Sequence, residues 1–182
     1  MDKENIKILQ PKNQLSLFGY ENHFKSFVNL YNKNELPHAI LLSGPRGLGK
    51  ATFAYHLINY ILSYKENEKY SLDKFKINSN NKSYNFLCNS THPNFFSFDN
   101  ELSQEEIKID HVRNLLKFLS KSTFLNNLKI VLIDNSEYLN RFASNALLKV
   151  LEEPSNNTFF FIIHHTATYL QNTIKSRCIE FK

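Results

Sequence analysis

Residues 44–50 form a stretch whose residue types and spacing could hold phosphate groups. Three of the chain's four glycines, Gly44, Gly47 and Gly49, fall here, and Lys50 follows directly. Glycine lets the backbone turn tightly and point its N–H groups inward, while lysine adds a full positive charge. The Gly-x-x-x-x-Gly-Lys spacing predicts a phosphate-cradling loop; the alternative is a plain glycine turn with a surface lysine. The candidate site also includes Pro45, Arg46, Leu48, Ala51 and Thr52.

The elements around this loop fit the same interpretation. Residues 39–42 are an apolar run of the kind that a buried parallel strand shows. A helical pattern of apolar residues follows the loop, formed by Phe53, Leu57, Ile58, Ile61 and Leu62. A helix that begins at the loop would add partial positive charge to the backbone N–H groups there.

The position after the lysine departs from the phosphate-loop motif. The motif places Ser or Thr there, whose hydroxyl binds Mg²⁺, but this chain has Ala51. Thr52 lies one residue further, about 100° around the helix axis, so we do not expect it to point to the same place. The loop is therefore predicted to hold phosphates more readily than Mg²⁺.

A carboxylate downstream could take part in the same site. Asp134 ends the apolar run of residues 129–134 and could bind Mg²⁺ directly or through water. The alternative is a strand-end aspartate that caps the next turn. Asn135 follows, and its amide can orient a water molecule but cannot take its proton.

The elements that must position these residues alternate along the chain. Helices are predicted at residues 21–33, 53–62, 107–119, 141–151 and 167–175, and strands at residues 39–42, 94–99, 129–134, 158–163 and 178–181. This alternation predicts an α/β fold with a five-stranded parallel sheet flanked by helices. Ligands bind at the carboxyl ends of such strands, where both the loop and Asp134 would lie.

Length and composition indicate one globular domain spanning residues 1–182. Hydrophobic residues make up 42% of the 182 residues and charged residues 21%. Residues 1–16 are expected to be a polar leading segment, and residues 63–90 a loosely ordered surface excursion. The net charge of +5 permits contact with nucleic acid without requiring it. With two distant cysteines, no signal peptide and no long apolar run, we expect a soluble cytoplasmic protein with no membrane partner.

Two downstream motifs carry a specific family resemblance. They are RFASNALLKVLEEP at residues 141–154 and TIKSRC at residues 173–178. With the glycine loop and IDNSE between, the chain resembles the AAA+ module of bacterial DNA polymerase III clamp-loader subunits from about residue 13 to 182. The stretches LPHAILLSGPRGLGKATFA and HPNFF favour the delta-prime branch of that family, which has a degraded ATPase site.

The resemblance implies roles for several residues. The arginine of the Ser-Arg-Cys motif, Arg177, would be a finger that reaches the nucleotide of a neighbouring subunit; the alternative is an ordinary surface arginine. The sensor position falls at His165 or Thr166, and the alignment leaves both open. Asn135 stands where hydrolysing AAA+ proteins have glutamate. Weak binding of ATP or ADP with little hydrolysis is therefore expected, as in a non-catalytic component of the polymerase III holoenzyme.

The resemblance also implies partners, and it leaves rival functions open. The partners would be the gamma/tau and delta subunits in a hetero-oligomer, and through it the sliding clamp and primer–template DNA. One rival is an ATP-hydrolysing gamma/tau-type motor, which Ala51 and Asn135 disfavour. Another is an AAA+ replication initiator or helicase loader, which would need a DNA-binding appendage that is not visible here. A nonfunctional fragment is the third.

Two features depart from the family pattern. Many delta-prime subunits carry a four-cysteine zinc module between the glycine loop and the Asp134 strand. Here that region has only Cys88, with His92 four residues on, so no structural zinc is expected. Cys178 is expected to be a small buried residue. The family's helical lid and collar are missing as well, so the chain is expected to be the core domain alone.

Overall fold

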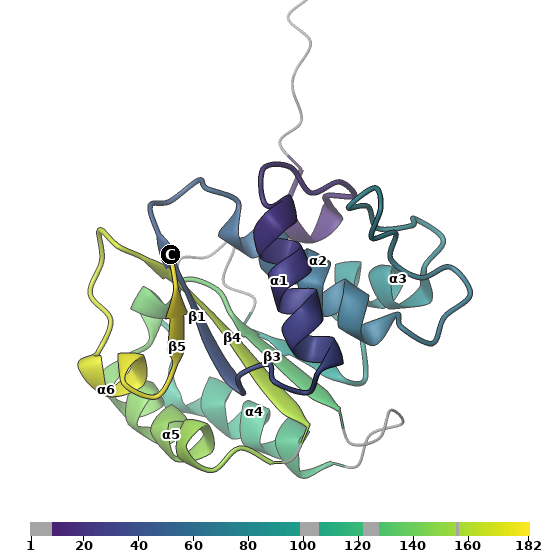
Figure 1. Cartoon of the computed structure of the whole chain (residues 1–182). Coiled ribbons are helices and arrows are strands. Elements are labelled where there is room, and N and C mark those ends of the chain that lie inside the picture. Colours follow the sequence, from purple (N-terminus) through teal and green to yellow (C-terminus); the bar gives the residue numbers. More distant parts are fainter. Residues whose placement is uncertain (1–8, 99–105, 122–127, 156) are drawn as a thin grey trace, which may run out of the picture.

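The computed structural model describes residues 9–98, 106–121, 128–155 and 157–182. A five-stranded sheet runs through its centre in the order β2-β3-β4-β1-β5, and all neighbouring strands pair in parallel (Figure 1). The strands are β1 Ala39–Gly44, β2 Phe95–Ser97, β3 Lys129–Ile133, β4 Thr158–His165 and β5 Ile179–Phe181. The predicted α/β class is confirmed. Residue 99 of the predicted second strand lies outside the described residues.

Helices cover both faces of this sheet. The described helices are α1 Glu21–Asn32, α2 Lys50–Leu62, α3 Lys82–Cys88, α4 Ile109–Ser120, α5 Arg141–Glu152 and α6 Asn172–Lys175, with short 3-10 turns at Pro11–Asn13 and Ser136–Tyr138. The first three lie on one side, and α4, α5 and α6 lie on the other (Figure 1). The last predicted helix is much shorter than residues 167–175. Within the described ranges, no helix is long and apolar enough to span a membrane.

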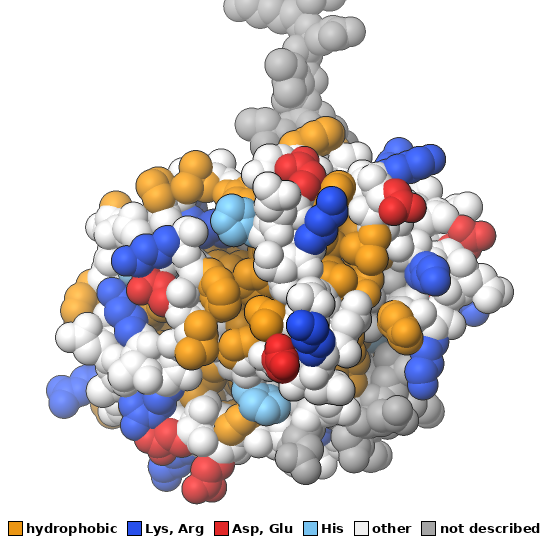
Figure 2. Space-filling model, in the orientation of Figure 1, with side chains coloured by type: hydrophobic (Ala, Val, Ile, Leu, Met, Phe, Trp, Pro, Cys, Tyr) orange, Lys and Arg blue, Asp and Glu red, His pale blue; other side chains and the backbone are white. Residues whose placement is uncertain are grey.

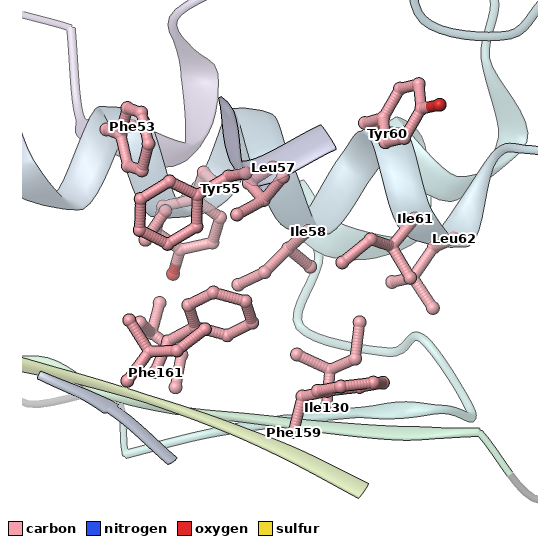
Figure 3. Close-up of a cluster of buried hydrophobic side chains, with 14 of the residues drawn as sticks. Phe53, Tyr55, Leu57, Ile58, Tyr60, Ile61, Leu62, Ile130, Phe159 and Phe161 are labelled. Carbon is pink, nitrogen blue, oxygen red and sulfur yellow. The ribbon is translucent and has the colours of Figure 1, made fainter. Parts of the chain in front are cut away.

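Alternating strand side chains divide the core into two clusters. On β4, Phe159 and Phe161 face α1 and α2, while Phe160 faces the opposite side with α4 and α5. This follows from the two-residue period of a strand, and burial of both faces explains why the strands read as continuous apolar runs. Figure 3 shows Ile130 and Phe161 of the sheet beneath Ile58 and other apolar side chains of α2. This packing fixes the start of α2 against the end of β1.

The segment at residues 63–90 corrects one expectation. Instead of a loosely ordered excursion, it contains α3 and packs against α2, with Tyr70, Ile77 and Leu87 each at most 4% exposed. The Glu66 carboxylate accepts hydrogen bonds from the first N–H groups of α3, at 2.8 and 3.0 Å. Isolated apolar residues in a polar stretch give no periodic signal, so the sequence pattern missed this packing.

A buried histidine joins this segment to α2 and to the leading residues. His56 Nε2 donates to the Gln14 carbonyl at 3.1 Å, so its Nδ1 accepts from the Tyr70 hydroxyl at 2.9 Å. Burial lowers the pKa of His56 to about 4, although the bond to the Gln14 carbonyl acts in the opposite direction. The imidazole is therefore neutral at pH 7 and is fully enclosed.

Candidate phosphate-binding site

The glycine loop has the backbone geometry that its sequence predicts. Gly47 and Gly49 adopt φ values of +86° and +77°, which side-chain-bearing residues rarely tolerate. Gly49 is the residue immediately before α2, so the N–H groups of the first helical turn, which have no partner within the helix, lie at the loop. The helix dipole adds positive potential at the same place, which favours an anion there.

A cleft of about 500 Å³ lies beside the loop and brings most of the predicted site together. Its walls are Leu9, Gln10, Pro11, Arg46, Gly47, Gly49, Lys50, Ala51, Thr52, Asp134, Asn135, Ile163 and His165. The loop and Asp134 meet at the carboxyl ends of the strands, as the parallel sheet requires. Residues 9–11 also form part of the wall. Sequence reasoning missed them because a polar leading segment carries no recognisable motif.

The Lys50 ammonium makes all of its hydrogen bonds within the protein. Its Nζ donates to the carbonyls of Gly44 at 2.9 Å and Pro45 at 2.6 Å, and it lies 3.2 Å from His165 Nδ1. An ammonium has three N–H donors and no acceptor, so these contacts use all of them. Burial lowers the pKa of Lys50, and the negative charges of Asp134 and Glu137 oppose that shift. A phosphate that binds this lysine must replace internal partners.

His165 connects Lys50 to the end of β3. Because Lys50 can only donate, His165 Nδ1 accepts, so Nε2 carries the proton and donates to Asn135 Oδ1 at 3.1 Å. Burial is the main cause that lowers the pKa of His165. Of the two residues left open for the sensor position, the structure brings His165 into the cleft. Thr166 is exposed and donates its backbone N–H to the Gly44 carbonyl at 3.2 Å.

Asp134 is partly buried at the floor of the cleft. Its Oδ1 accepts the backbone N–H of Asn135 at 2.8 Å, and burial raises the pKa of the carboxyl. A Mg²⁺ site of the expected kind needs this carboxylate together with a hydroxyl after the lysine. Ala51 offers no oxygen, and Thr52, one position further, also lines the cleft. The donor set fits phosphate groups, but it does not complete that magnesium site.

An apolar hollow of about 90 Å³ lies on the other side of the loop, between α1 and β5. Figure 2 shows apolar side chains gathered in this region of the visible face. At its edge the Tyr20 hydroxyl donates to the Leu48 carbonyl at 2.5 Å, and the Tyr20 ring lies against Phe53, with centroids 5.6 Å apart. The loop is therefore held from this side by Tyr20 and from the cleft side by Lys50.

Arg177 lies between α6 and β5 and does not line the cleft. Its Nε donates to Glu152 Oε1 at 2.8 Å, its Nη2 donates to the same oxygen, and its Nη1 donates to the Thr173 carbonyl at 2.8 Å. The side chain is 30% exposed. Arg177 therefore has no contact with this chain's own phosphate loop.

The residues considered for zinc are engaged elsewhere. His92 Nδ1 accepts from the Asn94 backbone N–H at 3.1 Å, so its Nε2 donates to Ser83 Oγ at 3.3 Å. Cys88 Sγ lies 3.4 Å from the Lys12 carbonyl. Across the described part of the chain, no group of three or more His, Cys, Asp or Glu could hold a metal ion. Cys178 is half-buried rather than fully buried, and burial raises its pKa to about 11.

The parallel sheet, the phosphate loop at the end of β1 and the carboxylate after β3 together define an AAA+ core domain. A family model described as "DNA polymerase III, delta subunit" matches residues 19–182. The chain therefore belongs to this family.

Individual relatives agree with this assignment. The chain is 36% identical to DNA polymerase III subunit delta' of Pseudomonas aeruginosa over 143 residues, which are 79% of this chain and 42% of that protein. It is 30% identical to DNA polymerase III subunit gamma of Buchnera aphidicola from Schizaphis graminum, over 95% of this chain and 45% of that protein. The chain spans less than half the length of the curated relatives it matches.

A solved structure supports the fold. The gamma subunit-related protein of Thermotoga maritima gives a TM-score of 0.59 at 24% identity, over 85% of this chain and 44% of that chain. At this level of identity the likeness establishes the fold alone.

Proposed function

We propose that this chain is the AAA+ core of a delta-prime-type clamp-loader subunit that works in DNA replication. It holds nucleotide weakly, hydrolyses little of it, and supplies Arg177 to the ATP of a neighbouring subunit. The observation that carries the proposal is a phosphate loop whose lysine is bonded within the chain, beside Ala51 and Asn135. Such a site retains the shape for phosphates without the groups that drive hydrolysis.

Within this chain's own cleft the residues act on phosphates in a limited way. The N–H groups at the start of α2 and the Lys50 ammonium would hold the phosphate oxygens. Asn135 could orient a water molecule, but an amide does not accept a proton from it. If ATP binds, its γ-phosphate would lie in this cleft. Asn135 would not activate a water molecule to hydrolyse it.

Arg177 suits action on a second subunit's nucleotide. A guanidinium is planar, is always charged, and donates two parallel hydrogen bonds to phosphate oxygens. It lies outside this chain's cleft, next to the short β5 at one edge of the sheet. Fingers of this kind stabilise charge that develops on the transferred phosphoryl group.

The proposed partners follow from the family. They are the gamma/tau and delta subunits in a hetero-oligomer, and through that assembly the sliding clamp and primer–template DNA in the cytoplasm. Relatives named as delta' and gamma subunits support membership of such an assembly. The likeness to gamma also keeps a motor function as a second candidate.

One experiment separates the two candidates in a reconstituted assembly that contains a full-length version of this subunit. Lys50→Ala disables this chain's own site, whereas Arg177→Ala removes the finger. The proposal expects clamp- and DNA-stimulated ATPase and clamp loading to survive Lys50→Ala and to fall with Arg177→Ala. The motor candidate expects the opposite order, with Lys50→Ala the more damaging change.

A further inference from the structure

Arg177 is held by a side chain from another element. Glu152 is the last residue of α5, and α5 lies beside α6 on the same face of the sheet (Figure 1). Glu152 Oε1 accepts hydrogen bonds from both Nε and Nη2 of Arg177, so the carboxylate occupies one edge of the guanidinium. The Thr173 carbonyl accepts from Nη1 at 2.8 Å. Two elements distant in the sequence thus fix one side chain.

These contacts leave part of the guanidinium available. An arginine side chain has five N–H donors, and the three contacts to Glu152 and Thr173 account for three of them. The other two N–H groups belong to the terminal nitrogens Nη1 and Nη2. Each could donate a hydrogen bond to a phosphate oxygen of another molecule.

The Glu152 side chain is 47% exposed, but the helix that carries it is packed into the core. Leu147 and Leu151 of α5 are buried against the sheet, at 0% and 6% exposed, so the end of this helix is fixed by core packing. An unrestrained arginine samples many rotamers, and the conformational entropy that it loses on binding weakens its interaction with a phosphate. A carboxylate on a packed helix removes much of that freedom before any ligand arrives.

We propose that Glu152 is a positioning residue that orients Arg177 for the nucleotide of the neighbouring subunit. The inference rests on the proposed function of Arg177 and deepens it. Glu152 binds the Nε and Nη2 donors of Arg177, and its proposed role requires no contact of its own with the nucleotide. Its effect is exerted through the orientation of Arg177.

The test uses the reconstituted assembly with a full-length version of this subunit, in which only the neighbouring subunit retains a functional ATP site. Glu152→Ala removes the acceptor, and Glu152→Gln keeps an oxygen acceptor without the charge. Glu153→Gln is the matched control: it removes the same charge one residue along, from an exposed side chain with no hydrogen bond among the described residues.

We expect Glu152→Ala to lower kcat of the neighbour's site by roughly 10- to 100-fold, with KM for ATP little changed. Glu152→Gln should recover part of that loss, and Glu153→Gln should match the parent. A general folding defect is excluded by thermal melting of each variant. The ¹⁵N–¹H signal of Arg177 Nε gives a second readout: we expect slow solvent exchange in the parent and fast exchange in Glu152→Ala.

The outcomes separate this inference from the function on which it rests. If Arg177→Ala is without effect in the same assembly, the finger assignment itself fails. If Arg177→Ala is damaging while Glu152→Ala has the parent's kcat, Arg177 acts without Glu152 and the positioning role is wrong. An unchanged Arg177 Nε signal in Glu152→Ala would also overturn it.

Discussion

At the scale of single residues, a hydrogen-bonded chain from Lys50 through His165 to Asn135 distinguishes this site. The sequence predicted Lys50 from its motif and left the sensor position open between His165 and Thr166. The end of β4 beside β1 places His165 in the cleft and turns the Thr166 backbone N–H toward the Gly44 carbonyl. A motif spacing carries no information on the direction of a side chain at the end of a distant strand.

This chain of contacts predicts weak nucleotide binding and slow turnover by the isolated protein. Phosphates must displace the internal partners of Lys50, and the residue directly after Asp134 is Asn135, whose amide cannot take a proton from water. We expect steady-state ATP turnover well below about 1 s⁻¹, the low end of ordinary enzymes. Lys50→Ala should abolish the residual binding. Turnover at or above that rate by the isolated chain would favour the motor function.

The internal contacts of Cys88 and His92 lead to a prediction on metal content. Burial lowers the pKa of His92 to about 4, and both of its ring nitrogens already have hydrogen-bond partners. One cysteine and one histidine do not close a tetrahedral site. We expect less than stoichiometric zinc after dialysis, measured by elemental analysis. One zinc ion per chain would contradict this expectation.

At the scale of elements, the strongest predictions came from periodic segments. The strand at residues 129–134 and the helix at residues 141–151 lie where their apolar patterns place them, as β3 and α5. The packing of residues 63–90 was not predictable in this way. It depends on single contacts, such as Glu66 at the start of α3 and His56 with Tyr70, which have no period in the sequence.

The buried His56 predicts a pH dependence of stability. Its pKa is about 4 in the folded protein and about 6.5 when unfolded, so only the unfolded chain gains this proton as pH falls from 6.5 to 4. Folding stability linked to His56 is complete above pH 6.5 and declines below it, by up to about 3 kcal/mol. His92 adds a loss of the same sign.

The measurement is the free energy of unfolding in urea at pH 7 and pH 5. His56→Gln should be less stable than the parent at pH 7, and the gap should narrow at pH 5. His23→Gln, at an exposed position of α1, serves as the control and should leave the pH dependence unchanged. A gap between parent and His56→Gln that is the same at both pH values would refute the assignment.

At the scale of the whole molecule, the parallel sheet brings the loop and Asp134 together at the carboxyl ends of its strands. Arg177 lies outside the cleft that they form. Alternating strands and helices were sufficient to predict that the loop and Asp134 meet, but not where Arg177 lies. A residue that acts on the nucleotide of a neighbouring subunit cannot be predicted in this way, because the site belongs to two chains. A single sequence indicates it only through family resemblance, here by the Ser-Arg-Cys motif.

The most direct test of the account is the rate at which the neighbouring subunit hydrolyses ATP in a single turnover. The measurement compares assemblies that carry the parent, Arg177→Lys or Arg177→Ala in a full-length version of this subunit. The account predicts a loss at the neighbour's site that approaches the roughly 10³- to 10⁵-fold contribution of related fingers, with lysine a poor substitute. Equal rates for all three, with unchanged melting temperatures, would show that Arg177 is an ordinary surface residue and contradict the central claim.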